Sequence, residues 1–168
     1  MVLLSDQNEE ERREDALPLK VRDVMVREVI TVDEDSTVKE AVDVMNEFQI
    51  GSLIVLEKGR AMGIVTERDF LRRVISGAKD IMNTKVKEIM TTPLVVVEPS
   101  MDLEDAVKLM FHSKIKKLAV VDANKLVGIV TLTDIARFQP QMIKMLKQLT
   151  TKQATPKSIQ KVIDYYIV

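Results

Sequence analysis

The sequence predicts an α+β fold made of two β-α-β-β-α units that pack through their sheets about a pseudo-twofold axis. The first observation is an internal repeat: residues 21–74 align without gaps with residues 86–139, 65 positions further on. The identical pairs include Met25/Met90, Ala41/Ala106, Leu53/Leu118, Gly63/Gly128, Thr66/Thr131 and Asp69/Asp134. The second observation is the order of hydrophobic patterns, which is the same in both copies. A three-stranded sheet with two helices is too thin to bury both of its faces, so we expect the two copies to bury their apolar faces against each other.

Each copy opens with a short β-branched run that predicts a strand, at residues 29–32 and again at 94–97. A helix is predicted next. In the first copy Thr37-x-x-Glu40 has the capping-box pattern that starts helices. The apolar residues that follow recur with helical spacing. They are Val38, Ala41, Val42 and Met45 in the first copy, and Leu103, Ala106, Val107 and Met110 in the second.

Two further apolar runs in each copy predict a β-hairpin, because only a four-residue turn separates them. The predicted strands are 53–56 and 62–65 in the first copy and 118–121 and 127–130 in the second. A last helix is predicted to start at Thr66 and at Thr131. The domains expected along the chain are a charged N-terminal arm (1–17), repeat 1 (18–80), repeat 2 (81–139) and a C-terminal helical tail (140–168).

The composition excludes several classes of site. The chain has no cysteine and one histidine, His112, so neither a disulfide nor a zinc site built from cysteine or several histidines can form. The 25 basic and 26 acidic side chains give a formal net charge of −1, which argues against a protein that mainly grips DNA. No apolar run reaches the ~18 residues of a membrane span. We expect a soluble, cytoplasmic protein.

Catalytic motifs are not recognisable in the sequence, and we expect no enzyme activity. The most informative motif is Gly-Ile-Val-Thr-x-x-Asp, at residues 63–69 and 128–134. One interpretation is a capping box that only starts a helix. The other is a nucleotide site, because a helix N-terminus and a Thr hydroxyl can bind phosphate and a carboxylate can accept both ribose hydroxyls.

The doubled pattern resembles a tandem pair of CBS domains, the Bateman module. The resemblance covers about residues 21–139 and depends on several motifs together. They are Val-x-Asp/Glu-x-Met at 21–25 and 86–90, Met-Thr-Thr-Pro-Leu at 90–94, Ala-Val-x-x-Met at 41–45 and 106–110, Leu-Ala-Val-Val-Asp at 118–122, and both Gly-Ile-Val-Thr-x-x-Asp runs.

The resemblance implies a regulatory module without catalysis and without a cofactor, whose ligand is AMP, ADP, ATP or S-adenosylmethionine. The ligands would lie in two clefts between the repeats. The first cleft would use Ile30, Ile50, Gly51, Ser52, Thr131 and Asp134. The second would use Val95, Ile115, Lys116, Lys117, Thr66, Arg68 and Asp69. In these sets Ile30 and Val95 would pack on adenine, Asp69 and Asp134 would hold ribose, and the threonines would lie near phosphate. A homodimer is also implied.

The two clefts are expected to differ in their preference for charge. Lys116 and Lys117 stand where the first repeat has Gly51 and Ser52, and basic residues favour a polyphosphate if they reach it. Two alternatives stay open. One is a ligand-independent interaction scaffold with an effector protein as partner. The other is a nucleic-acid-binding protein that uses residues 114–117, Arg72, Arg73 and the lysine-rich tail.

Overall fold

The computed structural model describes residues 18–138, so the predicted arm at 1–17 and tail at 140–168 lie outside the described residues. The first repeat contains β1 (Thr31–Asp33), α3 (Val38–Phe48), β2 (Ser52–Glu57), β3 (Arg60–Thr66), α4 (Glu67–Asp69) and the π-helix η1 (Phe70–Ile75). The second contains β4 (Val96–Val97), α5 (Leu103–His112), β5 (Lys117–Asp122), β6 (Lys125–Thr131) and α6 (Leu132–Phe138). Two short helices precede the repeats: α2 (Val21–Val24) and the 3-10 helix η2 (Val86–Glu88). The predicted β-α-β-β-α order is confirmed in both copies.

Each repeat folds into its own three-stranded sheet, ordered β1-β2-β3 and β4-β5-β6. The first strand of each sheet runs parallel to the second, and the second and third form the predicted antiparallel hairpin. The hairpin turns place two consecutive residues at positive φ: Lys58 and Gly59 in one, Ala123 and Asn124 in the other. Two such residues are the mark of the tight turns that match the twist of paired strands.

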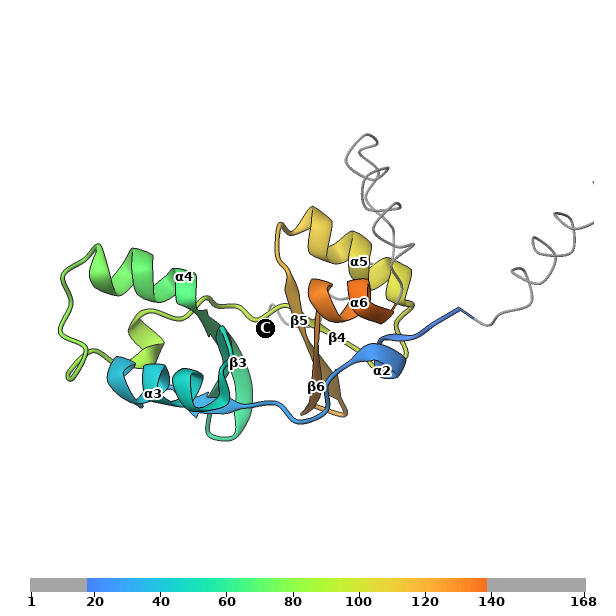
Figure 1. Ribbon diagram of the computed structural model, residues 1–168. Helices are drawn as coiled ribbons and strands as arrows, with labels where there is room; N and C mark the ends of the chain where they lie inside the picture. Colours follow the sequence, from blue (N-terminus) through green and yellow to red (C-terminus); the bar gives the residue numbers. More distant parts are fainter. Residues whose placement is uncertain (1–17, 139–168) are drawn as a thin grey trace, which may run out of the picture.

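The inner strands β2 and β5 are buried on both faces. In β2, Leu53 and Val55 belong to the core under the helices, whereas Ile54 belongs to a separate cluster between the two sheets. In β5 the same alternation places Leu118 under the helices and Ala119 between the sheets. Figure 1 shows the two sheets facing each other, with α3 and α4 outside one sheet and α5 and α6 outside the other. The predicted packing through the sheets follows from this alternation, because successive side chains point to opposite faces.

The repeats also exchange the short segments that precede them. Helix α2 belongs by sequence to the first repeat, yet it lies beside α6 of the second (Figure 1). Its Val21 backbone N–H donates to the Met101 carbonyl at 2.9 Å, and Val26 exchanges two 2.9 Å backbone bonds with Ile129 on β6. Lys20 forms an ion pair with Asp102, with 2.8 Å between Nζ and Oδ1.

Helix η2 shows the matching arrangement on the first repeat. The Val86 N–H donates to the Ser36 carbonyl at 2.9 Å, and Thr91 exchanges backbone bonds of 2.8 and 3.0 Å with Ile64 on β3. We call residues 18–26 and 83–91 the first and second crossing segments. We call a sheet, its helices and the crossing segment that packs on them a packing unit. Each packing unit therefore contains the crossing segment that belongs, in the sequence, to the other repeat.

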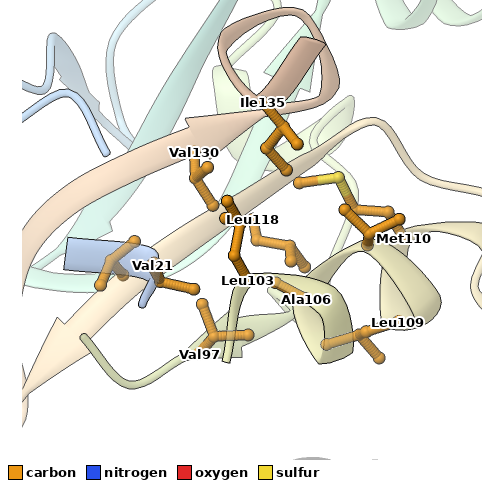
Figure 2. Packing of buried hydrophobic residues seen from close by; sticks show 11 residues of the cluster. Val21, Val97, Leu103, Ala106, Leu109, Met110, Leu118, Val130 and Ile135 are labelled. Carbon is orange, nitrogen blue, oxygen red and sulfur yellow. The ribbon is translucent and has the colours of Figure 1, made fainter. Parts of the chain in front are cut away.

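The core of the second unit includes a residue from the first crossing segment. Figure 2 shows Val21 among Val97, Leu103, Leu118 and Val130, and Val21 is fully buried there. On the first unit, Val86 and Ile89 are fully buried in the equivalent core. Val21 and Val86 are thus apolar because each of them is buried in the core of the other repeat.

The helix predicted after Thr66 differs from its counterpart after Thr131. It consists of the single turn α4 followed by the π-helix η1, whereas α6 is α-helical throughout its described length. Phe70 and Val74 are buried, but Leu71 is 60% exposed. None of the helices within residues 18–138 has the length and apolar composition needed to cross a membrane.

Candidate functional site

Both Thr-x-x-Asp turns lie where a hairpin strand passes into a helix. Thr66 ends β3 and Thr131 ends β6. In the first turn, the Thr66 backbone N–H and hydroxyl donate to Asp69 Oδ2 at 2.9 and 2.7 Å. In the second turn, the corresponding distances to Asp134 Oδ2 are 3.0 and 2.6 Å. The predicted capping interaction is therefore confirmed at both turns.

These bonds occupy groups that a phosphate was expected to use. A threonine hydroxyl has one proton, and in both turns that proton is donated to the aspartate. The first N–H group of each helix is also engaged: the Glu67 N–H donates to the Gly51 carbonyl at 3.2 Å, and the Leu132 N–H donates to the Lys116 carbonyl at 2.9 Å. The turns hold the starts of β2 and β5 in place. Phosphate binding there requires further donors or a rotated hydroxyl.

The two turns differ in the contacts made by the second carboxylate oxygen, Oδ1, of their aspartates. Asp69 Oδ1 accepts a 3.2 Å bond from the Thr91 hydroxyl and lies 3.4 Å from Arg73 Nη1. Arg73 Nη1 also donates to the carbonyls of Ile89 and Met90, at 2.6 and 2.7 Å. Asp69 is consequently 8% exposed and tied to the second crossing segment.

Asp134 lacks this second set of partners. The positions equivalent to Thr91 and Arg73 are Val26 and Phe138, whose side chains cannot donate. Among residues 18–138, Asp134 Oδ1 accepts no hydrogen bond, and Asp134 is only partly buried. Among the described residues, Asp134 Oδ1 thus has no contact that an incoming hydroxyl would have to replace, whereas Asp69 Oδ1 has two.

Ser52 and Lys117 hold equivalent positions in the two repeats, differ in charge, and contact each other. Lys117 Nζ, at the start of β5, donates to Ser52 Oγ at the start of β2, at 2.8 Å. Burial lowers the pKa of the Lys117 ammonium, and the negative charges of Glu67 and Asp134 oppose that shift. Glu67 itself lies over Gly51: a Cβ at Gly51 would be 3.1 Å from Glu67 Oε2. Strand pairing sets Ser52 opposite Thr66 and Lys117 opposite Thr131.

The remaining predicted residues divide into apolar and exposed groups. Ile30 and Ile50 are partly buried against the core of the first repeat, and Val95 and Ile115 hold the equivalent places in the second. Lys116 and Arg68 are exposed. The structure thus joins the two predicted residue sets through Lys117, whose ammonium bonds to a residue of the other set. Within residues 18–138, no group of three His, Cys, Asp or Glu side chains could hold a metal ion.

The sequence interpretation did not assign three residues to these turns: Glu67, Arg73, which it named only for nucleic-acid binding, and Thr91, which it named only within a family motif. The signal that could have identified them was the comparison of the copies. Their counterparts are Leu132, Phe138 and Val26, so each position exchanges a polar side chain for an apolar one.

Fold and turns together define a protein made of two small α+β repeats that meet through their sheets and carry one Thr-x-x-Asp turn each. The chain belongs to the CBS domain family, whose pattern matches residues 21–76 and 86–140. It is 41% identical over 116 residues to the CBS domain-containing protein YhcV of Bacillus subtilis, an alignment that covers 69% of this chain and 82% of YhcV.

Solved structures of similar proteins agree with the fold. The conserved CBS domain protein TA0289 of Thermoplasma acidophilum superposes with a TM-score of 0.70 and is 28% identical, covering 82% of this chain and 79% of that one. The CBS domain pair of protein MJ0100, solved with 5′-methylthioadenosine and S-adenosyl-L-methionine, superposes with a TM-score of 0.67. It is 23% identical and covers 75% of this chain and 99% of that pair, so the likeness is one of fold.

Proposed function

We propose that this protein is a regulatory module that binds an adenosine-containing ligand and catalyses no reaction. The observation that carries the proposal is Asp134 Oδ1, which accepts no hydrogen bond from the described residues and lies at a helix start. It is next to the contact between Lys117 and Ser52, which we call the repeat junction. An acceptor oxygen suits a ribose hydroxyl and an ammonium suits a phosphate. The MJ0100 pair, of the same fold, was solved with two adenosyl compounds, which supports this ligand class.

The ligand would act by its differential affinity for two arrangements of the repeats. AMP, ADP, ATP and S-adenosylmethionine all have the required ribose, and they differ in charge next to it. We place adenine against Ile30 and Ile50 in the first site, and against Val95 and Ile115 in the second. The first site is the stronger one in this proposal, because Asp134 is open and Asp69 is held by Arg73 and Thr91.

Calorimetric titration of the full chain with the four compounds tests the proposal and gives the stoichiometry. We expect Asp134→Asn to weaken binding about tenfold or more, since a hydrogen bond to a charged group contributes ~1.5–3 kcal/mol. The matched control is Glu40→Gln, which alters the capping box of α3 away from these residues and leaves binding unchanged. Equal affinities of the Asp134→Asn variant and the parent would contradict the site.

The scaffold alternative is favoured by one specific observation: in both turns the aspartate carboxylate accepts bonds from the threonine N–H and hydroxyl. It predicts that none of the four compounds shifts thermal unfolding, whereas a ligand at 100 times its dissociation constant adds ~2.7 kcal/mol of stability. Nucleic-acid binding would instead show affinity that falls steeply with salt.

A homodimer is part of the same proposal. Leu71 and Ile75 are 60% and 69% exposed on adjacent turns of η1, and Phe48 at the end of α3 is 50% exposed. Exposed large apolar side chains that form a patch are typical of protein interfaces, and Leu71 and Ile75, four residues apart on η1, are candidates for one. Sedimentation of the full chain measures the mass directly. A cytoplasmic location stays a prediction, which cell fractionation tests.

A further inference from the structure

We infer that Lys117 is a single positive charge shared by the two candidate sites, so that a phosphate-bearing ligand in one site lowers the affinity of the other for a second such ligand. The inference rests on the proposed function and deepens it. Lys117 starts β5 beside Ile115 and Lys116 of the second site, but its ammonium bonds to Ser52 of the first site. Its backbone pairs with Thr131, also of the first site.

Four of the other groups in the two turns that could donate to phosphate are already engaged. Both threonine hydroxyls donate to their own aspartates, and the first helical N–H groups donate to Gly51 and Lys116 carbonyls. Lys116 and Arg68 are exposed, so their charges are screened by water and salt. Lys117 is part-buried, and its ammonium has three protons of which Ser52 accepts one. It is the cation best placed to meet phosphate at the junction.

The charges that face Lys117 explain why it cannot serve two phosphates equally. Glu67 of the first repeat and Asp134 of the second both act on its ammonium. Asp69 is paired with Arg73 and needs no further cation. Two carboxylates, those of exposed Glu67 and part-buried Asp134, thus face one part-buried ammonium, and a bound phosphate adds more negative charge. Once Lys117 turns toward a phosphate in one site, the other site is left with a carboxylate but without the ammonium. Its negative charge then repels a second phosphate.

The flexible stem of lysine makes this sharing practicable, because four rotatable bonds let the ammonium move between neighbouring acceptors. Coupling between sites must also be reciprocal: each phosphate weakens the other by the same factor. Adenosine has the ribose and the base but no phosphate. It should therefore bind the two sites without this antagonism.

The experiment titrates adenosine and AMP into the full chain and into two variants, by calorimetry. Lys117→Met removes the charge and keeps the apolar stem. Lys125→Met removes the same charge at the exposed end of β6, outside both candidate sites, and is the matched control. In the parent and in Lys125→Met we expect AMP to bind about tenfold more tightly than adenosine at the first site, and a second AMP to bind about tenfold more weakly than the first, within the range of typical coupling.

In Lys117→Met both tenfold differences should disappear, while adenosine binds as in the parent. The variant should fold, since it removes a part-buried charge, and its thermal midpoint without ligand should not fall. Suppose that Lys117→Met still binds AMP tenfold more tightly than adenosine, and the second AMP tenfold more weakly than the first. The inference of a shared charge is then wrong, although the proposed ligand class stands. If neither adenosine nor AMP binds the parent, the proposed function and this inference are overturned together.

Discussion

Two glycines show how single residues permit the crossing of the chain. A Cβ at Gly128 would lie 2.7 Å from Met25 Sδ and 3.0 Å from the Val26 carbonyl oxygen. At Gly63 the corresponding distances are 2.8 Å to Met90 Sδ and 2.9 Å to the Thr91 carbonyl oxygen. A glycine within a strand allows a ligand or another backbone segment to approach closely. What approaches each of them is a crossing segment.

Replacing Gly128 with alanine should therefore destabilise the protein by about 1–3 kcal/mol, the usual cost of overpacking. Urea unfolding measures the loss. Met25→Ala in the same chain should recover part of it, because the Sδ contact is gone while the backbone contact stays.

Gly59→Ala is the control for backbone conformation. Its Cβ would meet no atom within 4 Å, but its φ of +79° penalises a side chain by ~1–2 kcal/mol. Met25→Ala should not relieve this loss. A recovery of equal size in both backgrounds would contradict the steric explanation.

At the scale of elements, the helix starts differ in what their caps touch. Thr37 and Glu40 form a closed capping box at α3, with the Glu40 N–H on Thr37 Oγ1 at 3.2 Å and the Thr37 N–H on Glu40 Oε2 at 2.7 Å. At α5, by contrast, Asp102 makes no side-chain cap and pairs with Lys20 of the first crossing segment. The side-chain cap of α3 is thus a local contact, whereas the side chain at the start of α5 pairs with a residue 82 positions away.

The α3 capping box predicts a pH dependence. The Thr37 backbone N–H, and after it the Thr37 side chain, hold the pKa of the Glu40 carboxyl below its ordinary 4.5. A lowered pKa means that the contribution to stability is present above pH 4.5 and is lost as the pH falls through the folded-state pKa. We expect Glu40→Gln to be less stable than the parent at pH 7, and the difference to shrink as the pH falls below 4.5. Urea unfolding at a series of pH values from 7 downward checks this, and a difference that does not shrink in acid would refute it.

At the scale of the whole molecule, the crossing segments make each packing unit depend on a piece of the other sequence repeat. Val21 completes the core that contains Leu118, and Val86 completes the core that contains Leu53. The cluster around Ile54 and Ala119 then joins the two sheets. Residues 18–138 therefore form three hydrophobic clusters, and each of them contains side chains from both sequence repeats.

Val21→Ala should lower the unfolding free energy by about 1–3 kcal/mol, from lost burial and the cavity that remains. Native-state hydrogen exchange locates the effect: we expect protection to fall more in β5 than in β2. Val86→Ala is the mirror control and should affect β2 more. Equal losses in both sheets for both variants would show that the two units open as one.

The sequence by itself determined the features that depend on near neighbours: the strand and helix periodicities, the α3 capping box, and the turn at Gly59. It also determined the pairing of the copies, since the run 53–56 is apolar at every position and so needs cover on both faces. The Thr-x-x-Asp turns could be located but not interpreted, because a cap and a nucleotide site use the same residues at the same spacing.

Tertiary structure alone decided how the two turns differ. Asp69 is held by Thr91 from the second crossing segment, and Arg73 ties it to the carbonyls of Ile89 and Met90. Lys117 reaches Ser52 across 65 positions of sequence. These contacts join residues with no local pattern in common, and the π-helical geometry of η1, from which Arg73 extends, departs from the predicted helical spacing. The physical reason is that side-chain partners at the junction are chosen by the packing of two sheets, which no periodicity within either repeat encodes.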